Sequence, residues 1–238
     1  MNEAKGLPRF VSFSGMDGAG KSTQIALLLS RLHRAGFSAR VLTFWDDIAL
    51  LGRVRELATL RLFRGDSGVG SPGNPVNRRD KNVSNLHLNL VRCFLYLVDA
   101  AGVWFSVRRL ARDRIDVVIF DRYIYDELAN LPLHRRPFRA YARLLLKLIP
   151  APDVAFVLDA DPVQARQRKP EYPLEFLHRN RAAYRTLAEV AKGVIVTPPL
   201  TQDEVSEQVQ RAVVDHVFFG SPVSSPQVCV IPRVPTNR

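Results

Sequence analysis

Residues 15–22 form a glycine-rich segment that is suited to holding phosphate groups. Their sequence, Gly-Met-Asp-Gly-Ala-Gly-Lys-Ser, satisfies the pattern GxxxxGK[ST] between an apolar run and a helical pattern. In such a loop successive N–H groups face the phosphates, the lysine (Lys21) reaches the β- and γ-phosphates, and the Ser22 hydroxyl can ligate Mg²⁺. The pattern predicts an ATP and Mg²⁺ site made by Gly15, Gly18, Ala19, Gly20, Lys21, Ser22 and Thr23.

A carboxylate and a guanidinium follow directly after a second apolar run. Asp121 and Arg122 come after Val117–Phe120, a run typical of a buried strand. Ligands of open α/β sheets bind at the carboxyl ends of the strands, so both side chains should lie near the phosphate loop. Asp121 can hold Mg²⁺ directly or through water, and Arg122 can contact a transferring or acceptor phosphate. A structural Asp–Arg pair is the competing interpretation.

A short basic segment, residues 164–170, ends at a proline and contains Arg166, Arg168 and Lys169. Cationic groups placed there could neutralise the charge that develops on a transferring phosphoryl group. A basic run is also typical of a solvated helix face, so that interpretation stays open for each residue.

Alternating strands and helices are expected to position these residues. Short apolar runs typical of buried parallel strands lie at residues 10–13, 39–44, 117–120, 154–158 and 194–196. Helical patterns lie between them at residues 21–35, 85–112, 126–149 and 174–192. Strands that alternate with helices in this order predict an α/β fold with a parallel sheet covered on both faces.

The length of 238 residues and the hydrophobic content of 47% suit one domain with a substantial core, which we assign to residues 1–219. Within it, residues 65–81 are rich in Gly, Pro, Asn and charge and predict a flexible loop, either a substrate cover or a surface insertion. Residues 220–238 carry repeated Pro and Ser and predict a C-terminal tail.

Three segments resemble blocks of the thymidylate kinase family, in the right order: Phe13–Gln24, Asp121–Tyr123 and Glu175–Tyr184. Asp17, inside the phosphate loop, is distinctive because it matches the acidic residue by which that family approaches the sugar of the acceptor nucleotide. The resemblance implies a three-layer P-loop kinase fold, with a five-stranded parallel core sheet and helices on both faces. It also implies a lid, here residues 164–173, that closes over the phosphates.

The activity that the resemblance implies is ATP-dependent phosphoryl transfer to a nucleoside monophosphate, from dTMP to dTDP. Asp17, Arg92 and Arg122 would then lie near the acceptor. No dedicated base is demanded when the acceptor is already an ionised phosphate, because positioning and electrostatics carry this reaction. The residues that would stabilise the transfer are Lys21, Arg122, Arg166 and Arg168.

The chain departs from the family in segments that touch acceptor recognition. The Arg-Glu-Pro-Gly-Gly type segment expected after the second strand is replaced by Phe44–Ile48, and the polar residues expected after Asp-Arg-Tyr are replaced by Ile124–Leu128. If Arg92 matches the family's arginine on the third helix, Leu88 takes the place of its stacking phenylalanine; an internal structural role for Arg92 is equally open. Two arginines could substitute for the missing acceptor-phosphate ligand: Arg53 and Arg55.

Composition and charge narrow the classes of partner and site that are open to the protein. The formal charge of +11 suits an anionic partner without identifying it, and two cysteines without metal-ligand spacing argue against a disulfide framework or a zinc site. The N-terminus lacks the apolar stretch of a signal peptide, and the runs 88–105 and 141–149 carry charges typical of buried helices. We therefore expect a cytoplasmic protein that does not use membrane as a partner, with a homodimer among the assemblies open to it.

Three other functions stay open at this stage. A kinase for a nucleoside or another small hydroxyl compound could use Asp46 or Asp47, after the second strand, as its base. A regulatory nucleotide-binding module could keep the phosphate loop without productive acceptor binding. A nucleic-acid-binding protein would fit the charge, but no aromatic RNP-like strand, zinc knuckle or clear helix-turn-helix supports it, so no nucleic-acid partner is expected.

Overall fold

The structure, a computed structural model, describes residues 8–48 and 86–218. Its sheet has five parallel strands in the order β2-β3-β1-β4-β5. The strands are β1 Arg9–Gly15, β2 Ala39–Thr43, β3 Val117–Asp121, β4 Val154–Leu158 and β5 Val194–Thr197. Each apolar run that predicted a strand forms one, and the five-stranded parallel core sheet is confirmed.

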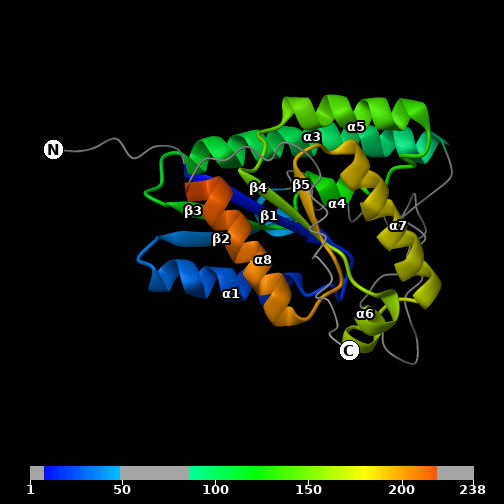
Figure 1. Cartoon of the computed structure of the whole chain (residues 1–238). Coiled ribbons are helices and arrows are strands. Elements are labelled where there is room, and N and C mark those ends of the chain that lie inside the picture. The colour runs from blue at the N-terminus through cyan, green and yellow to red at the C-terminus, as the bar shows by residue number, and fades with distance from the viewer. Residues whose placement is uncertain (1–7, 49–85, 219–238) are drawn as a thin grey trace, which may run out of the picture.

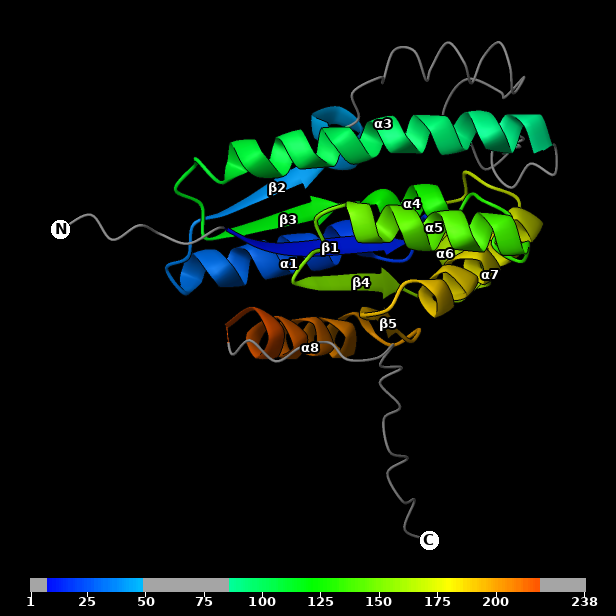
Figure 2. The same ribbon diagram turned by 90° about the horizontal axis from the view of Figure 1, so that it is seen from above.

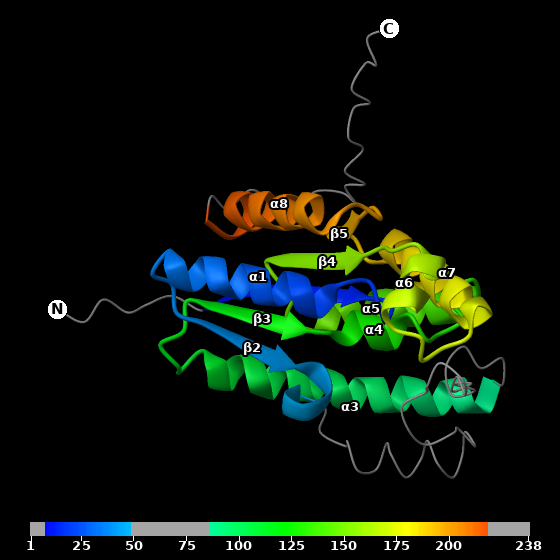
Figure 3. The same cartoon turned by 90° about the horizontal axis from the view of Figure 1, so that it is seen from below.

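Helices cover both faces of this sheet and complete three layers (Figure 1). α3 and α5 lie over one face and run along the strands when seen from above (Figure 2), whereas α1 and α8 lie over the other. The arrows of β2, β3 and β4 point toward the end of the molecule where α6 and α7 lie (Figure 3), and β1 and β5 run parallel to them. The helices are α1 Lys21–Arg34, α3 Leu86–Leu110, α4 Ile124–Leu128, α5 Arg136–Leu148, α6 Pro162–Arg168, α7 Leu174–Val190 and α8 Gln202–Val213.

Side chains of the central strand β1 alternate between two hydrophobic cores. Phe10 points toward the α3 and α5 layer and stacks on Phe120, with ring centroids 5.7 Å apart. Phe13 points toward α1 and α8 and stacks on Phe156, at 5.1 Å. A strand buried on both faces needs apolar side chains at successive positions, which is why these strands appear in the sequence as continuous apolar runs.

The single helix expected over residues 126–149 is a wrong prediction, because α4 and α5 are separate helices. The chain leaves the helical conformation after Leu128 and resumes at Arg136. Pro132 lies in this break and Pro137 lies in the first turn of α5. Proline has no N–H to donate inside a helix but fits its first turn, so the two prolines account for the break and the new start. Helix α8 was not predicted.

Helix α3 is only half buried, which corrects the expectation that residues 88–105 form a buried helix. One of its faces packs on the sheet through residues such as Tyr96 and Val103. The other exposes large apolar side chains, with Phe94 63% and Phe105 68% exposed. Among the described residues, α3 is the one helix long and apolar enough to cross a membrane by composition, a criterion that core helices of globular proteins also meet.

Three predictions fall on residues that the structure does not describe. These are the loop at residues 65–81, the tail at residues 220–238, and the two substitute acceptor arginines, Arg53 and Arg55.

Candidate active site

The glycine-rich segment forms the turn between β1 and α1, where it packs tightly against the segment that follows β4. Gly15 has φ +138° and Gly18 has φ +81°, conformations that side-chain-bearing residues rarely adopt. A Cβ atom on Gly15 would lie 2.5 Å from the Leu158 carbonyl oxygen, and one on Gly18 would lie 2.5 Å from that of Ala165. Backbone conformation and close packing therefore favour glycine at both positions.

The Lys21 side chain folds back across the loop. Its ammonium donates hydrogen bonds to the carbonyl oxygens of Gly15 and Met16, at 2.8 and 3.0 Å, and the residue is buried. Burial and the nearby Arg122 charge lower the pKa of Lys21 to about 8, although the carboxylates around it act in the opposite direction. An ammonium held this close to the loop meets the phosphates that the loop's N–H groups would bind.

Arg122 and Asp17 form an ion pair across the carboxyl ends of β3 and β1. Arg122 Nη2 donates to Asp17 Oδ1 at 2.5 Å, and Nη1 donates to Asp126 at 3.2 Å. Although burial disfavours the guanidinium charge, these two carboxylates outweigh it and raise the pKa of Arg122. The sequence left Asp17 available to a sugar hydroxyl, whereas the structure pairs it with Arg122. The Asp–Arg pair considered for Arg122 exists, but with Asp17 and Asp126 rather than Asp121.

The donor set expected for Mg²⁺ is compatible with that ion. Asp121 lies half-buried at the carboxyl end of β3, in register with Phe13 of β1, and Ser22 and Thr23 are exposed in the first turn of α1. Hydroxyl and carboxylate oxygens are the ligands that Mg²⁺ prefers, and the ion usually needs only one or two of them beside phosphate oxygens. Within residues 8–48 and 86–218, no group of three or more His, Cys, Asp or Glu side chains that could hold a metal ion occurs.

The basic segment predicted as a lid forms helix α6, which begins at Pro162 and lies against the phosphate loop. The Asp161 carboxylate caps its N-terminus by accepting from the N–H groups of Val163 and Gln164. Arg168 Nη1 donates to the Gly18 carbonyl oxygen at 3.2 Å, so this arginine reaches the loop. Arg166 is exposed on the same helix and is not brought into contact with the loop.

Arg92 is buried on α3, where its Nη1 donates to the Asn130 carbonyl oxygen at 3.3 Å. Asn130 follows α4, and its side chain in turn donates to the Asp126 carbonyl oxygen. Arg92 therefore contacts the segment that carries Asp126, and Asp126 in turn contacts Arg122 of the Asp17–Arg122 pair.

Sequence reasoning missed the polar groups that support this site. Ser14 and Tyr184 both donate to Asp126, a buried residue of α4, at 2.6 Å. Asp159, after β4, accepts from Arg181 at 2.6 and 2.8 Å and from Arg185 at 2.8 Å, which anchors α7 to the sheet edge. Those hydrogen bonds lower the pKa of Asp159 against the effect of burial. A sequence signal existed for Ser14, Arg181 and Tyr184, which lie inside or at the end of the resembling segments.

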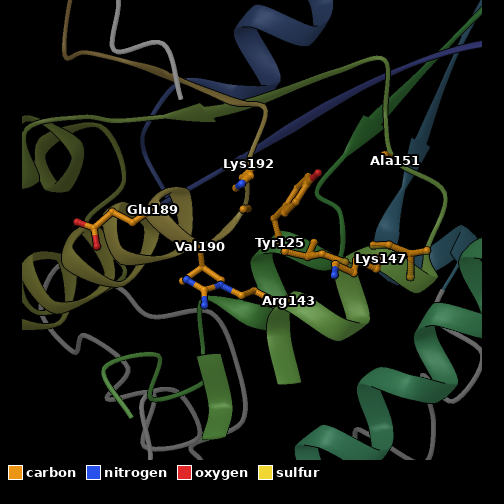
Figure 4. A pocket seen from close by; sticks show the side chains of 10 residues that line it. Tyr125, Arg143, Lys147, Ala151, Glu189, Val190 and Lys192 are labelled. Atoms are coloured by element: carbon orange, nitrogen blue, oxygen red, sulfur yellow. The ribbon is translucent and has the colours of Figure 1, made fainter. Parts of the chain in front are cut away.

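A separate cavity of about 550 Å³ lies between the C-terminal ends of α5 and α7 (Figure 4). Tyr125 and apolar groups line it, together with Arg143, Lys147 and Lys192. Basic residues are common at helix C-termini, where they offset the carbonyl dipoles. None of the predicted site residues lines this cavity.

No protein-family model matches the chain. The solved structure of thymidylate kinase from Candida albicans matches with a TM-score of 0.58 and 15% identity, covering 94% of this chain and all of that one, which supports the fold. Thymidylate kinase from Solidesulfovibrio magneticus is 28% identical over 86% of this chain and 98% of its own length. A probable thymidylate kinase from Methanosphaera stadtmanae is 23% identical over 87% and 98%.

The chain is therefore similar to several thymidylate kinases over most of its length. This similarity confirms the resemblance carried by the phosphate loop, the Asp-Arg-Tyr segment and the segment that ends at Tyr184. Because the relatives are matched over nearly their whole length, the similarity covers the three layers as well as the loop. At such identities, the contacts of individual side chains have to be argued from the structure.

Proposed function

We propose that this protein transfers the γ-phosphoryl group of ATP to a nucleoside monophosphate, with dTMP as the leading acceptor. The observation that carries the proposal is the cluster of Lys21, Asp17 and Arg122 on one edge of the sheet, beside a loop built to hold phosphates. The names of the relatives, thymidylate kinases matched over nearly their whole length, support dTMP as the acceptor.

Each part of the cluster has a distinct task in this reaction. The loop glycines and the N-terminus of α1 hold the phosphates of ATP through backbone N–H groups. Ser22 and Asp121 would hold Mg²⁺, which would supply positive charge to neutralise the phosphates. Lys21 and Arg168, which both contact carbonyl oxygens of the loop, are the cations that would meet the transferring group. Arg122 uses two of its five N–H groups to hold Asp17 and Asp126, and the acceptor phosphate is the ligand for the others.

The kinase for a hydroxyl acceptor is less well supported than it was from the sequence. Its candidate base Asp47 accepts a hydrogen bond from the Thr43 N–H at 2.7 Å, so this carboxylate stabilises the end of β2. Asp46 is exposed and remains available to that role. An acceptor panel decides between the two readings: we expect ADP formation with dTMP, whereas turnover with thymidine and none with any monophosphate would favour the hydroxyl kinase.

Replacing Asp121 with asparagine should weaken the binding of Mg²⁺, so that the reaction needs a higher Mg²⁺ concentration. The amide is a poorer ligand than the carboxylate, so we expect the half-saturating Mg²⁺ concentration to rise about tenfold, with a lower kcat. A Mg²⁺ titration of initial rates measures this. Asp113→Asn is the matched control, because Asp113 is an exposed carboxylate away from the loop. Superimposable titrations for wild type and Asp121→Asn would remove Asp121 from the metal site.

The pH dependence should report Lys21. Its ammonium, rather than the free amine, attracts the phosphates, and its pKa in the free enzyme is lowered to about 8. The value of kcat/KM for ATP should therefore be level below about pH 8 and fall as the pH rises further, approaching tenfold per unit. Bound phosphates stabilise the ammonium, so kcat should fall only at higher pH. Profiles that stay flat to about pH 10 would contradict this role.

We also propose that the protein forms a homodimer through α3. Along its exposed face, residues 87, 90, 94, 97, 101, 104 and 108 recur at alternating spacings of three and four, and those from Leu90 to Trp104 are apolar. This is the spacing by which one helix packs on another. A second α3 supplies a matching face, whereas a lipid surface would not require the alternation.

A charge placed in the middle of that face should separate the subunits. We expect wild type to show twice the mass of one chain by size-exclusion chromatography with light scattering, and Phe94→Glu to show the mass of one. Val214→Glu is the matched control, because Val214 is an exposed apolar residue directly after α8, and α8 covers the face of the sheet opposite α3. A wild-type protein that stays monomeric at high concentration would refute the homodimer.

A further inference from the structure

Asp126 is a buried carboxylate surrounded by four hydrogen-bond donors. Its Oδ2 accepts from the Ser14 hydroxyl at 2.6 Å and from the Tyr123 N–H at 3.1 Å. Its Oδ1 accepts from the Tyr184 hydroxyl at 2.6 Å and from Arg122 Nη1 at 3.2 Å. The donors come from β1, from the turn after β3 and from α7, so this carboxylate joins three segments that are far apart in the sequence.

These four donors occupy the whole hydrogen-bonding capacity of the group. A carboxylate offers about four lone-pair sites, and each oxygen of Asp126 already accepts two donors. A carboxylate in this state cannot accept a proton from an acceptor or ligate a metal without releasing one of its donors. Its chemistry is therefore to hold the donors in place.

The donor that gains most from being held is Arg122. Within residues 8–48 and 86–218 it is the one non-glycine residue with a positive φ, +69°, a conformation that costs free energy. Its N–H donates to the Phe13 carbonyl oxygen at 2.9 Å, and its guanidinium is fixed between Asp126 and Asp17. Such backbone conformations persist where the surroundings impose them and occur often at functional sites.

Tyr184 brings α7 into this arrangement. Burial, and then the negative charge of Asp126, raise the pKa of Tyr184 well above its ordinary value, so its hydroxyl remains a donor across the working pH range. Helix α7 follows the lid helix α6 and packs against it. A displacement of α7 would therefore reach Asp126 through this hydroxyl.

We propose that Asp126 is a positioning residue for Arg122, and that Tyr184 and Ser14 fix the carboxylate that does so. Strand β1, through Ser14, and helix α7, through Tyr184, would then together hold the Arg122 guanidinium at a fixed distance from the transferring group. The inference rests on the proposed function in that Arg122 is taken to contact a phosphate.

A matched pair of tyrosine variants separates positioning from stability. Tyr184→Phe and Tyr141→Phe each remove one phenolic hydroxyl that donates a hydrogen bond of 2.6 Å, but Tyr141 donates to the Cys93 carbonyl oxygen, away from Arg122. We expect Tyr184→Phe to lower kcat about tenfold with an unchanged KM for ATP, and Tyr141→Phe to leave both constants unchanged. Equal kcat values in the two variants would overturn the proposal.

A double-substitution cycle tests whether Tyr184 affects kcat through Arg122. If Tyr184 acts through Asp126 on Arg122, then Tyr184→Phe should cause no further loss of kcat in an Arg122→Lys background. Full additivity of the two losses would show that Tyr184 acts independently of Arg122, and the proposal would fail.

A readout without turnover separates this inference from the proposed function. In ¹⁵N-arginine-labelled protein, an immobilised Arg122 should give separate Nη signals, identified by their absence in Arg122→Lys. We expect them to merge in Asp126→Asn and in Tyr184→Phe, and separate signals in both variants would overturn the proposal. If no monophosphate is phosphorylated while these signals behave as expected, the proposed function fails and the positioning role of Asp126 stands.

Discussion

Lys21→Ala should lower kcat/KM for ATP by about 10²–10³-fold or more while the protein stays folded. The ammonium of Lys21 lies against the loop, where it donates to the carbonyl oxygens of Gly15 and Met16. In the proposed function, its removal takes away charge that stabilises the transferring group. Steady-state kinetics with ATP and a phosphorylated monophosphate such as dTMP measures this loss of kcat/KM.

Stability should change in the opposite direction from activity in this variant. The lowered pKa of Lys21 means that folding places its charge in a less favourable environment, by an amount on the order of 3 kcal/mol. Removing the side chain relieves that cost, so the thermal unfolding midpoint of Lys21→Ala should equal or exceed that of wild type. An active variant would contradict the assignment of the phosphate loop, and an unfolded one would mean that the lysine is mainly structural.

Gly18→Ala should lower kcat about 100-fold because it displaces helix α6 from the loop. The added Cβ would lie 2.5 Å from the Ala165 carbonyl oxygen and 3.0 Å from its carbonyl carbon, and neither is the end of a flexible side chain. Helix α6 must therefore shift, and the hydrogen bond from Arg168 to the Gly18 carbonyl oxygen is lost with it.

The matched control for this substitution is Gly36→Ala. Gly36 has nearly the same backbone conformation, φ +84°, but no atom within 4 Å of its hypothetical Cβ, and it follows α1 at the opposite end from the loop. Both variants should lose about 1–2 kcal/mol of unfolding free energy from the left-handed conformation, but only Gly18→Ala should lose activity. Comparable kcat values for the two variants would show that the contact with α6 does not matter for transfer.

The features that the sequence predicts well are those set by neighbouring residues. A strand buried on both faces requires an apolar run, which is why Val154–Leu158 was recognisable, and a phosphate loop requires glycines at fixed offsets from Lys21. The break between α4 and α5 could also have been found, because Pro132 and Pro137 are local signals.

The features that the sequence does not predict depend on contacts between distant residues. Ser14 and Asp126 are 112 positions apart and Tyr184 is 58 positions beyond Asp126, so no local pattern connects them. Likewise the pairing of Asp17 with Arg122 appears only when β1 and β3 lie side by side. Residue types alone left Asp17 open to a sugar hydroxyl, because they do not show that a guanidinium already meets it.

The most direct test of the central claim is to identify the phosphorylated product. Purified protein, ATP and Mg²⁺ would be incubated with dTMP, and separately with thymidine, and each mixture followed by ³¹P NMR, with Lys21→Ala as the inactive control. The proposed function predicts ADP together with the two coupled resonances of dTDP, formed only when dTMP is present. The claim would be contradicted if dTMP stays unchanged while thymidine acquires a single phosphate ester.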